Sequence, residues 1–183
     1  MATSNIILTI VLVGGIGLLV AASVRAWRVW RRYAAARIVT CPETSNPAAV
    51  HVDAMRAVFS ALLDSGPTIT LRACSRWPER GLCAQPCLCQ IESGEAPDVP
   101  GLAARWYGRK SCAYCGRIIS DGPSGVSRAA LLGPDGVTIE WREVAPERLV
   151  SAFGTQHPVC WNCHVAETFR RLYPELVVDR PPH

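Results

Sequence analysis

The sequence is poor in lysine and histidine, and much of its positive charge is concentrated in one short segment. Lys110 is the single lysine beside 18 arginines, and the four histidines are scattered at positions 51, 157, 164 and 183. Five arginines fall within residues 25–37, so the rest of the chain carries 14 basic residues against 15 acidic ones. This nearly neutral remainder lacks the basic surface that nucleic acid requires. Four scattered histidines also do not predict a histidine-rich catalytic metal site.

The sequence also lacks the short motifs that mark common catalytic machinery. It contains no nucleophile elbow, phosphate-binding loop, dinucleotide fingerprint or metalloprotease helix. We therefore expect a structural or interaction protein and not an enzyme.

One long apolar segment lies near the start of the chain. Residues 6–24 carry no charged side chain, and as a helix that rises ~1.5 Å per residue they would cross roughly 28 Å, about one bilayer core. A cleaved signal peptide is the alternative, but such a peptide has basic residues before its apolar run, whereas the first arginine here is Arg25. The sequence therefore predicts a single transmembrane helix.

The residues that follow this span predict its orientation. They combine arginines with aromatic residues typical of a membrane interface, at Arg25, Trp27, Arg28, Trp30, Arg31, Arg32, Tyr33 and Arg37. By the positive-inside rule the N-terminus faces outward and the remainder lies in the cytoplasm. We expect the helix to continue as a basic amphipathic segment to about residue 36, with its arginines on anionic lipid headgroups.

Nine cysteines are the most distinctive part of the composition. An odd number argues against a fully paired disulfide framework. A reducing cytoplasm would keep the thiols free to bind metal. The remainder of the chain is rich in glycine and proline, and a small loop-rich domain needs such cross-links. We therefore interpret the cysteines first as metal ligands.

Two C-x-x-C pairs form the most specific motif in the chain. Cys112 and Cys115 are followed by Gly116, which permits the positive-φ turn found after such a pair. Cys160 and Cys163 open a predicted helix, whose N-terminal dipole favours thiolate. Because two such pairs can close a tetrahedron around Zn²⁺, we predict one structural zinc, with iron as the alternative metal. Four thiolates would leave no open coordination position for a substrate.

The segment between the pairs has the pattern of a hairpin followed by helices. Strands are predicted over residues 128–132 and 137–141, and helices over 146–153 and 165–173. A cysteine turn, a hairpin and a ligand pair that opens a helix together resemble the treble-clef zinc fingers, over residues 110–173. The resemblance implies a structural zinc but no particular function. It implies as ligands Cys112, Cys115, Cys160 and Cys163.

The second pair also has another interpretation. Cys160, Cys163 and His164 form C-x-x-C-H, the attachment motif of c-type haem. Covalent haem attachment takes place on the exterior side of the membrane, opposite to the orientation predicted above. It would also leave Cys112 and Cys115 without a role. The alternative function is therefore an electron-transfer protein that carries haem or an iron centre on the exterior side.

Five further cysteines lie within residues 41–89. A helix predicted over residues 52–63 and a strand over 68–73 would bring four of them together. We predict a second zinc site there, with Cys89 as a spare or reactive thiol, and with the ligands Cys41, Cys74, Cys83 and Cys87. Reduced cysteines packed as small apolar residues and an iron–sulfur cluster are the alternatives. The segments that begin at Cys41 and Cys74 resemble a bacterial membrane-protein family, which implies no activity.

These patterns together predict an α+β architecture in four parts. Residues 1–37 form the membrane anchor, 38–91 a cysteine-rich lobe, 92–108 a linker and 109–183 the treble-clef-like zinc domain. We expect a membrane-anchored zinc-binding module that contacts lipid through its first helix and a protein partner at the cytoplasmic membrane surface.

Overall fold

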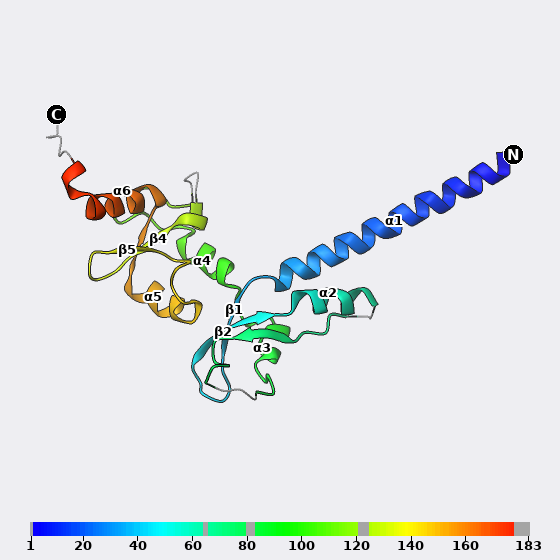
Figure 1. The fold of residues 1–183 in the computed structure, drawn as a ribbon, viewed down its shortest axis with the longest axis horizontal. Coiled ribbons are helices and arrows are strands. Elements are labelled where there is room, and N and C mark those ends of the chain that lie inside the picture. The colour runs from blue at the N-terminus through cyan, green and yellow to red at the C-terminus, as the bar shows by residue number, and fades with distance from the viewer. Residues whose placement is uncertain (1, 64–65, 80–82, 121–124, 178–183) are drawn as a thin grey trace.

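The computed structural model describes residues 2–63, 66–79, 83–120 and 125–177, with side chains described from residue 9 onward. The chain forms a long N-terminal helix followed by two lobes, each built on a three-stranded antiparallel sheet (Figure 1). The predicted mixture of helices and small sheets is confirmed.

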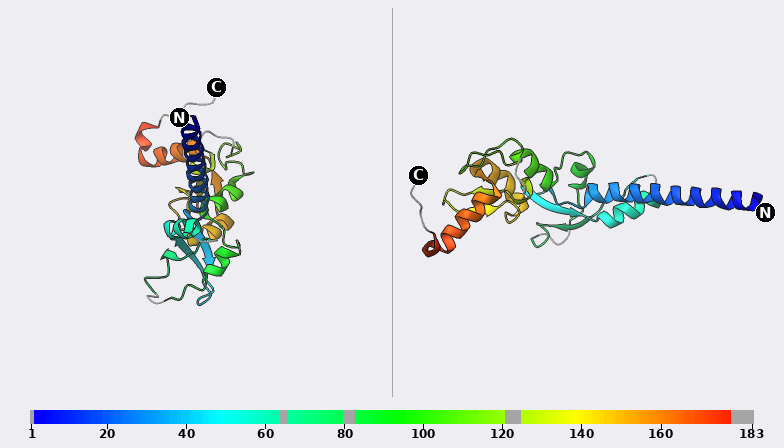
Figure 2. Two further views of the ribbon diagram at one scale, coloured as in Figure 1. Left: turned by 90° about the vertical axis from the view of Figure 1, so that its right-hand side faces the viewer. Right: turned by 90° about the horizontal axis from the view of Figure 1, so that it is seen from above.

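The first helix, α1 (Ala2–Tyr33), projects from the lobes along most of its length (Figures 1 and 2). Its 32 residues span about 48 Å at the rise of an α-helix. The segment Thr9–Tyr33 is long and apolar enough to cross a membrane, and a signal sequence near an N-terminus has the same properties. The helix ends where Tyr33, only 5% exposed, enters the core of the first lobe.

The first lobe pairs its sheet with two helices. Its elements are β1 (Arg37–Thr40), β2 (Pro47–Val52), α2 (Ala54–Leu63), β3 (Leu71–Cys74) and α3 (Leu88–Glu92). The strands lie in the order β1-β2-β3, and α2 packs along α1. The predicted helix over 52–63 is present as α2, and the predicted strand over 68–73 is present as β3 in a shifted position. Apolar residues of both strands and helices fill this core, including Val39, Val50, Leu71 and Ile91.

The second lobe contains the remaining elements. They are α4 (Val99–Tyr107), η1 (Gly125–Arg128), β4 (Ala130–Leu132), β5 (Thr138–Glu140), η2 (Pro146–Arg148), α5 (Leu149–Thr155), β6 (His157–Val159), α6 (Trp161–Leu172) and η3 (Pro174–Leu176). The hairpin predicted over residues 128–141 is present as β4 and β5, and β6 adds to the other edge of β4. The two predicted helices correspond to η2 with α5 and to α6.

Residues 92–108, predicted as a linker, instead contain the packed helix α4. The side chain of Asp98 caps this helix, and Pro100 lies in its first turn, where a missing N–H has no cost. Tyr107 is fully buried, and its hydroxyl donates to the carbonyl of Ala130 at 2.9 Å. The glycine and proline content of this stretch therefore marks the start of a helix and not an extended connection.

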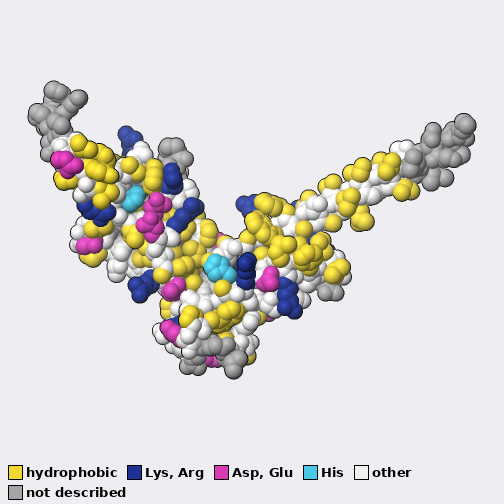
Figure 3. All heavy atoms as spheres, viewed as in Figure 1, with side chains coloured by type: hydrophobic (Ala, Val, Ile, Leu, Met, Phe, Trp, Pro, Cys, Tyr) yellow, Lys and Arg dark blue, Asp and Glu magenta, His cyan; other side chains and the backbone are white. Residues whose placement is uncertain are grey.

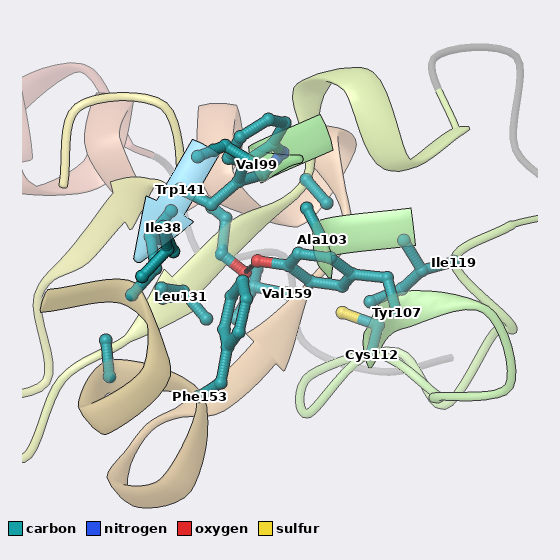
Figure 4. Packing of buried hydrophobic residues seen from close by; sticks show 14 residues of the cluster. Ile38, Val99, Ala103, Tyr107, Cys112, Ile119, Leu131, Trp141, Phe153 and Val159 are labelled. Atoms are coloured by element: carbon teal, nitrogen blue, oxygen red, sulfur yellow. Dashed lines mark hydrogen bonds between the residues drawn. The ribbon is translucent and has the colours of Figure 1, made fainter. Parts of the chain in front are cut away.

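The second core surrounds the sheet of the same lobe (Figure 4). The ring of Trp106 stacks on that of Phe153 with centroids 4.5 Å apart, and Tyr107 meets Phe153 edge to face. Cys112 lies at the border of this core and is 3% exposed. Packing of the core therefore fixes the start of the first C-x-x-C pair.

Strand β1 contributes to both cores. The side chain of Val39 is buried in the first, whereas that of its neighbour Ile38 is buried in the second. This alternation follows from the two-residue period of a β-strand. Backbone hydrogen bonds from Ile38 to Pro97 (3.1 Å) and from Val99 to Ala36 (2.9 Å) hold the start of α4 against the same strand.

Candidate metal centre

The two C-x-x-C pairs meet at one point in the second lobe. Among the described residues, one group of potential metal ligands has all its ligand atoms within 4.8 Å of one another. Its members are Cys112, Cys115, Cys160 and Cys163. We call this group the first cysteine centre. The prediction that the two pairs converge is confirmed, and the group is able to hold a metal ion.

A tight turn presents the first pair. The N–H of Gly116 donates to the carbonyl of Cys112, and the N–H of Cys112 donates to the carbonyl of Arg117, both at 2.9 Å. Gly116 has φ of +71°, a conformation in which a Cβ would be strained, as the sequence predicted. The N–H of Ala113 donates to the carbonyl of Pro158 at 2.8 Å. This bond fastens the turn to β6, which leads directly into the second pair.

The second pair occupies the first turn of α6. Cys160 is the N-cap residue in extended conformation, and Cys163 follows within the helix. The sulfurs of both residues lie within 4.8 Å of those of the first pair. The N–H of Cys160 donates to the sulfur of Cys112 at 3.3 Å.

The sulfur positions fit a tetrahedral ion better than a disulfide. The Sγ atoms of Cys115 and Cys160 lie 3.7 Å apart, whereas a disulfide bond is about 2.05 Å long. With metal–sulfur bonds of about 2.3 Å, the edge of a tetrahedron of thiolates is about 3.8 Å. All nine cysteines of the chain are free thiols.

Hydrogen bonding and burial act in opposite directions on these thiols. Burial disfavours the Cys112 thiolate, but N–H groups of Cys160, Cys115 and Tyr114 outweigh it, and the pKa of Cys112 falls to about 7. Burial is also the largest effect at Cys160 and Cys163, and there it prevails and raises both pKa values. Four adjacent thiols therefore cannot all ionise unless a cation neutralises them.

The histidine of the C-x-x-C-H motif is engaged outside the sulfur group. Nδ1 of His164 and Oγ1 of Thr138 share a hydrogen bond of 2.8 Å. Thr138 is on β5 and is 6% exposed, so this contact ties α6 to the hairpin. Sequence analysis did not single out Thr138, because no motif distinguishes one threonine in a strand.

Trp161, the first residue of α6, makes a cation–π contact. The guanidinium of Arg128 lies 4.3 Å from the ring centroid of Trp161, the residue that follows Cys160. Such a cation–π contact holds the indole in place next to the centre.

The second predicted set of ligands lies in the first lobe. Cys41, Cys74, Cys83 and Cys87 all line one small cavity of about 30 Å³. Among the described residues, only the sulfurs of the first centre all lie within 4.8 Å of one another. The four sulfurs of this second set are further apart. Cys89 does not line this cavity, and its exposed thiol donates to the carbonyl of Pro86 at 3.1 Å.

Comparison with known proteins identifies no relative of this chain. The geometry of the cysteines and the character of α1 are therefore the basis for any functional assignment. No known protein family, no curated protein and no solved structure matches the chain.

Proposed function

We propose that this chain is a membrane-anchored interaction module whose second lobe is stabilised by one structural zinc ion. The ligands are the four sulfurs of the first cysteine centre, and their gathering within 4.8 Å carries the proposal. Four thiolates leave no position for a substrate, so the ion contributes folding free energy and not catalysis.

The order of elements around the centre supports a treble-clef type of zinc site. A cysteine turn comes first, the β4–β5 hairpin follows, and the second ligand pair opens α6. Only the first pair is followed by a glycine, whereas an iron site of the rubredoxin type has one after each pair. Zinc is therefore favoured over iron.

The haem alternative fits the geometry less well. Thioether bonds to haem would engage Cys160 and Cys163, but in the structure these sulfurs lie among those of Cys112 and Cys115. The Nδ1 atom of His164 is bound to Thr138. These contacts support a shared four-sulfur site.

The continuity of α1 supports an anchor over a cleaved signal peptide. Tyr33 belongs to the core of the first lobe, Val29 packs against that core, and the same helix runs unbroken back to Ala2. The arginines that follow the apolar residues favour a cytoplasmic location for both lobes. A reducing compartment in turn keeps the thiols available for zinc.

Helix α6 supports an interaction role. None of its residues is buried, and an apolar row continues from it into the following turn. The exposed members of this row are Val165, Phe169, Leu172, Tyr173 and Leu176. An exposed apolar patch on a surface helix is typical of a protein-docking face. The partner we propose is a protein at the membrane surface.

Elemental analysis with a visible spectrum of the detergent-extracted full chain tests the metal assignment. The expected protein is colourless and contains zinc, and Cys115→Ser loses one zinc per chain. Cys89→Ser, which alters a thiol outside the centre, keeps the wild-type zinc content. A haem spectrum, or iron bound in place of zinc, would overturn the assignment.

A further inference from the structure

We propose a second zinc site in the first lobe, held by Cys41, Cys74, Cys83 and Cys87. This goes beyond the proposed function, which requires only the first cysteine centre. The four residues come from separate places: the residue after β1, the end of β3, the loop before α3 and the N-cap of α3. The fold nevertheless brings all four to one cavity of about 30 Å³.

Local turns hold these cysteines in the manner of metal ligands. The N–H of Gln85 donates to the sulfur of Cys83 at 3.4 Å, as the N–H of Cys160 does to Cys112 in the first centre. The carbonyl of Cys41 accepts the N–H of Ser45 at 2.8 Å, which closes a tight turn. Sulfurs in such turns accept backbone N–H groups, which stabilises thiolate.

The cavity is lined by two carboxylates, Glu43 and Glu79, and by one arginine that offers a buried donor. Zinc bound by four thiolates carries a net charge of −2. Arg76 lines the same cavity, and its Nε is buried with no hydrogen-bond partner among the described residues. Its Nη1 pairs with Glu79 at 2.9 Å, which leaves the Nε–H available to a thiolate. A buried donor of this kind is costly unless an acceptor is present.

The cavity gives the ion room. It is about the size of one water molecule. Sulfurs bound to zinc lie about 3.8 Å apart, so the four side chains would close inward on the ion. Only Cys87 among them is buried. Cys41 and Cys83 lie in loops that can adjust, and Cys74 is the last residue of β3.

The zinc content of the full chain in detergent tests this site. We expect two zinc ions per chain in the wild type and one in Cys83→Ser. Cys89→Ser, in the same loop but outside the cavity, should keep two. Cys83→Ser is preferred to Cys87→Ser because Cys87 is part of the core.

A wild-type content of one zinc ion per chain, unchanged by Cys83→Ser but lost in Cys115→Ser, would overturn the second site and leave the first intact. Iron–sulfur absorption that disappears in Cys83→Ser would also overturn it.

A separate observation concerns α2, which presents apolar residues on both sides. Ala57, Val58 and Ala61 are buried and face the core. The opposite side exposes residues at the i, i+4, i+7 and i+8 spacing of one helix face, namely Met55, Phe59, Leu62 and Leu63. The side chain of Leu63 is 84% exposed, and contact between so much apolar surface and water is unfavourable.

We infer that the far end of this outer face of α2, at Leu62 and Leu63, enters the lipid bilayer beside α1, an inference that rests on the proposed anchor. Helix α2 packs along α1 and runs back toward its N-terminus (Figures 1 and 2). On α1 the less exposed residues share one face, at Ala22, Ala26, Val29 and Tyr33.

The lengths of the two helices set the depth of α2. Its ten residues cover about 15 Å, whereas the twelve residues 22–33 of α1 cover about 18 Å. Ten residues counted back from Tyr33 along α1 end at Val24, so the far end of α2, with Leu62 and Leu63, reaches the border of the apolar span of residues 6–24. Figure 3 shows apolar side chains continuing from α1 onto the adjoining surface of the first lobe. Lipid is the occupant that this continuity favours.

Photocrosslinking of the full chain in phosphatidylcholine–phosphatidylglycerol nanodiscs tests this inference. A diazirine analogue of phenylalanine replaces Leu63 on α2, Leu18 in the span, or Phe169 on α6 as the matched control. We expect lipid adducts at 63 about tenfold above those at 169. Adducts at 18 but not at 63, or crosslinks from 63 to a second copy of the chain, would overturn the inference. Failure at 18 would overturn the anchor as well.

Discussion

The sulfur atoms of Cys115 and Cys160 lie 3.7 Å apart, although a complete hairpin and helix α5 separate the two residues along the chain. The approach depends on the hydrogen bond from Ala113 to Pro158, which holds the first turn against β6. A second hydrogen bond joins the N–H of Cys160 to the sulfur of Cys112, and a cation between the sulfurs would add a strong cross-link to these two bonds.

Removal of metal should therefore loosen both turns together. After treatment with a chelator, we expect amide exchange in residues 110–118 and 157–164 to accelerate by about tenfold or more. Exchange in η2 and α5 of the same lobe serves as the internal control and should change much less. Hydrogen–deuterium exchange with mass spectrometry measures this, and equal exchange with and without chelator would contradict a structural ion at this centre.

Replacement of Gly116 by alanine should weaken the first centre. A Cβ at φ of +71° is strained, and we expect a loss of about 1 kcal/mol in the free energy of unfolding. Gly154 in α5 is the matched control, because a Cβ there meets nothing within 4 Å and φ is not positive. Urea denaturation and zinc competition compare the two variants. Similar urea midpoints for the two variants would show that the turn does not require a positive φ at residue 116.

The stability of the metal-free chain should peak near the ordinary thiol pKa. The lowered pKa of Cys112 means that the folded state binds fewer protons than the unfolded state between pH of about 7 and 9, so stability rises there. The raised pKa values of Cys160 and Cys163 give the folded state more protons above pH of about 9, so stability falls. Urea midpoints across this range measure the effect.

Bound zinc should abolish the alkaline part of this profile, because its ligands are already deprotonated. Cys112→Ser should remove the rise between neutral pH and the maximum. A metal-free chain whose stability kept increasing well above the maximum would contradict the assigned directions.

Thr138→Val should destabilise the contact between α6 and the hairpin. The substitution conserves shape but removes the partner of His164 inside a buried site, at a cost of about 1–2 kcal/mol. Thr155→Val is the control, because the Thr155 hydroxyl bonds Ser151 in an exposed position. Thermal unfolding of the two variants measures the difference. An equal decrease of Tm in both would mean that the contact between Thr138 and His164 does not stabilise the fold.

Local signals in the sequence predicted the elements around the first centre. Gly116, the Gly-Pro-Asp-Gly turn and the apolar spacing of α6 each follow from backbone or periodicity rules. The sequence also predicted correctly that the two cysteine pairs meet. The identity of the ion, the treble-clef type and the orientation in the membrane stay predictions.

Other features depend on distant contacts that no local pattern reveals. Strands β1 and β2 are short and gain stability mainly from their mutual pairing and the core beneath them. Helix α4 contains Pro100 and Gly101, residues that are typical of a linker. Only the tertiary structure shows that this segment is a helix whose Tyr107 packs between the sheet and Phe153. Which sulfurs line the first-lobe cavity likewise depends on how far the loop before α3 folds back.

The alternation of Ile38 and Val39 has a mechanical consequence. Two adjacent side chains of one strand are inserted into different cores, and Tyr33 ties the end of α1 into the first of them. Rotation of one lobe against the other must therefore disturb buried apolar contacts within a few residues of the end of α1. With α1 anchored as proposed, this connection would hold α6 at a set distance and angle from the lipid surface.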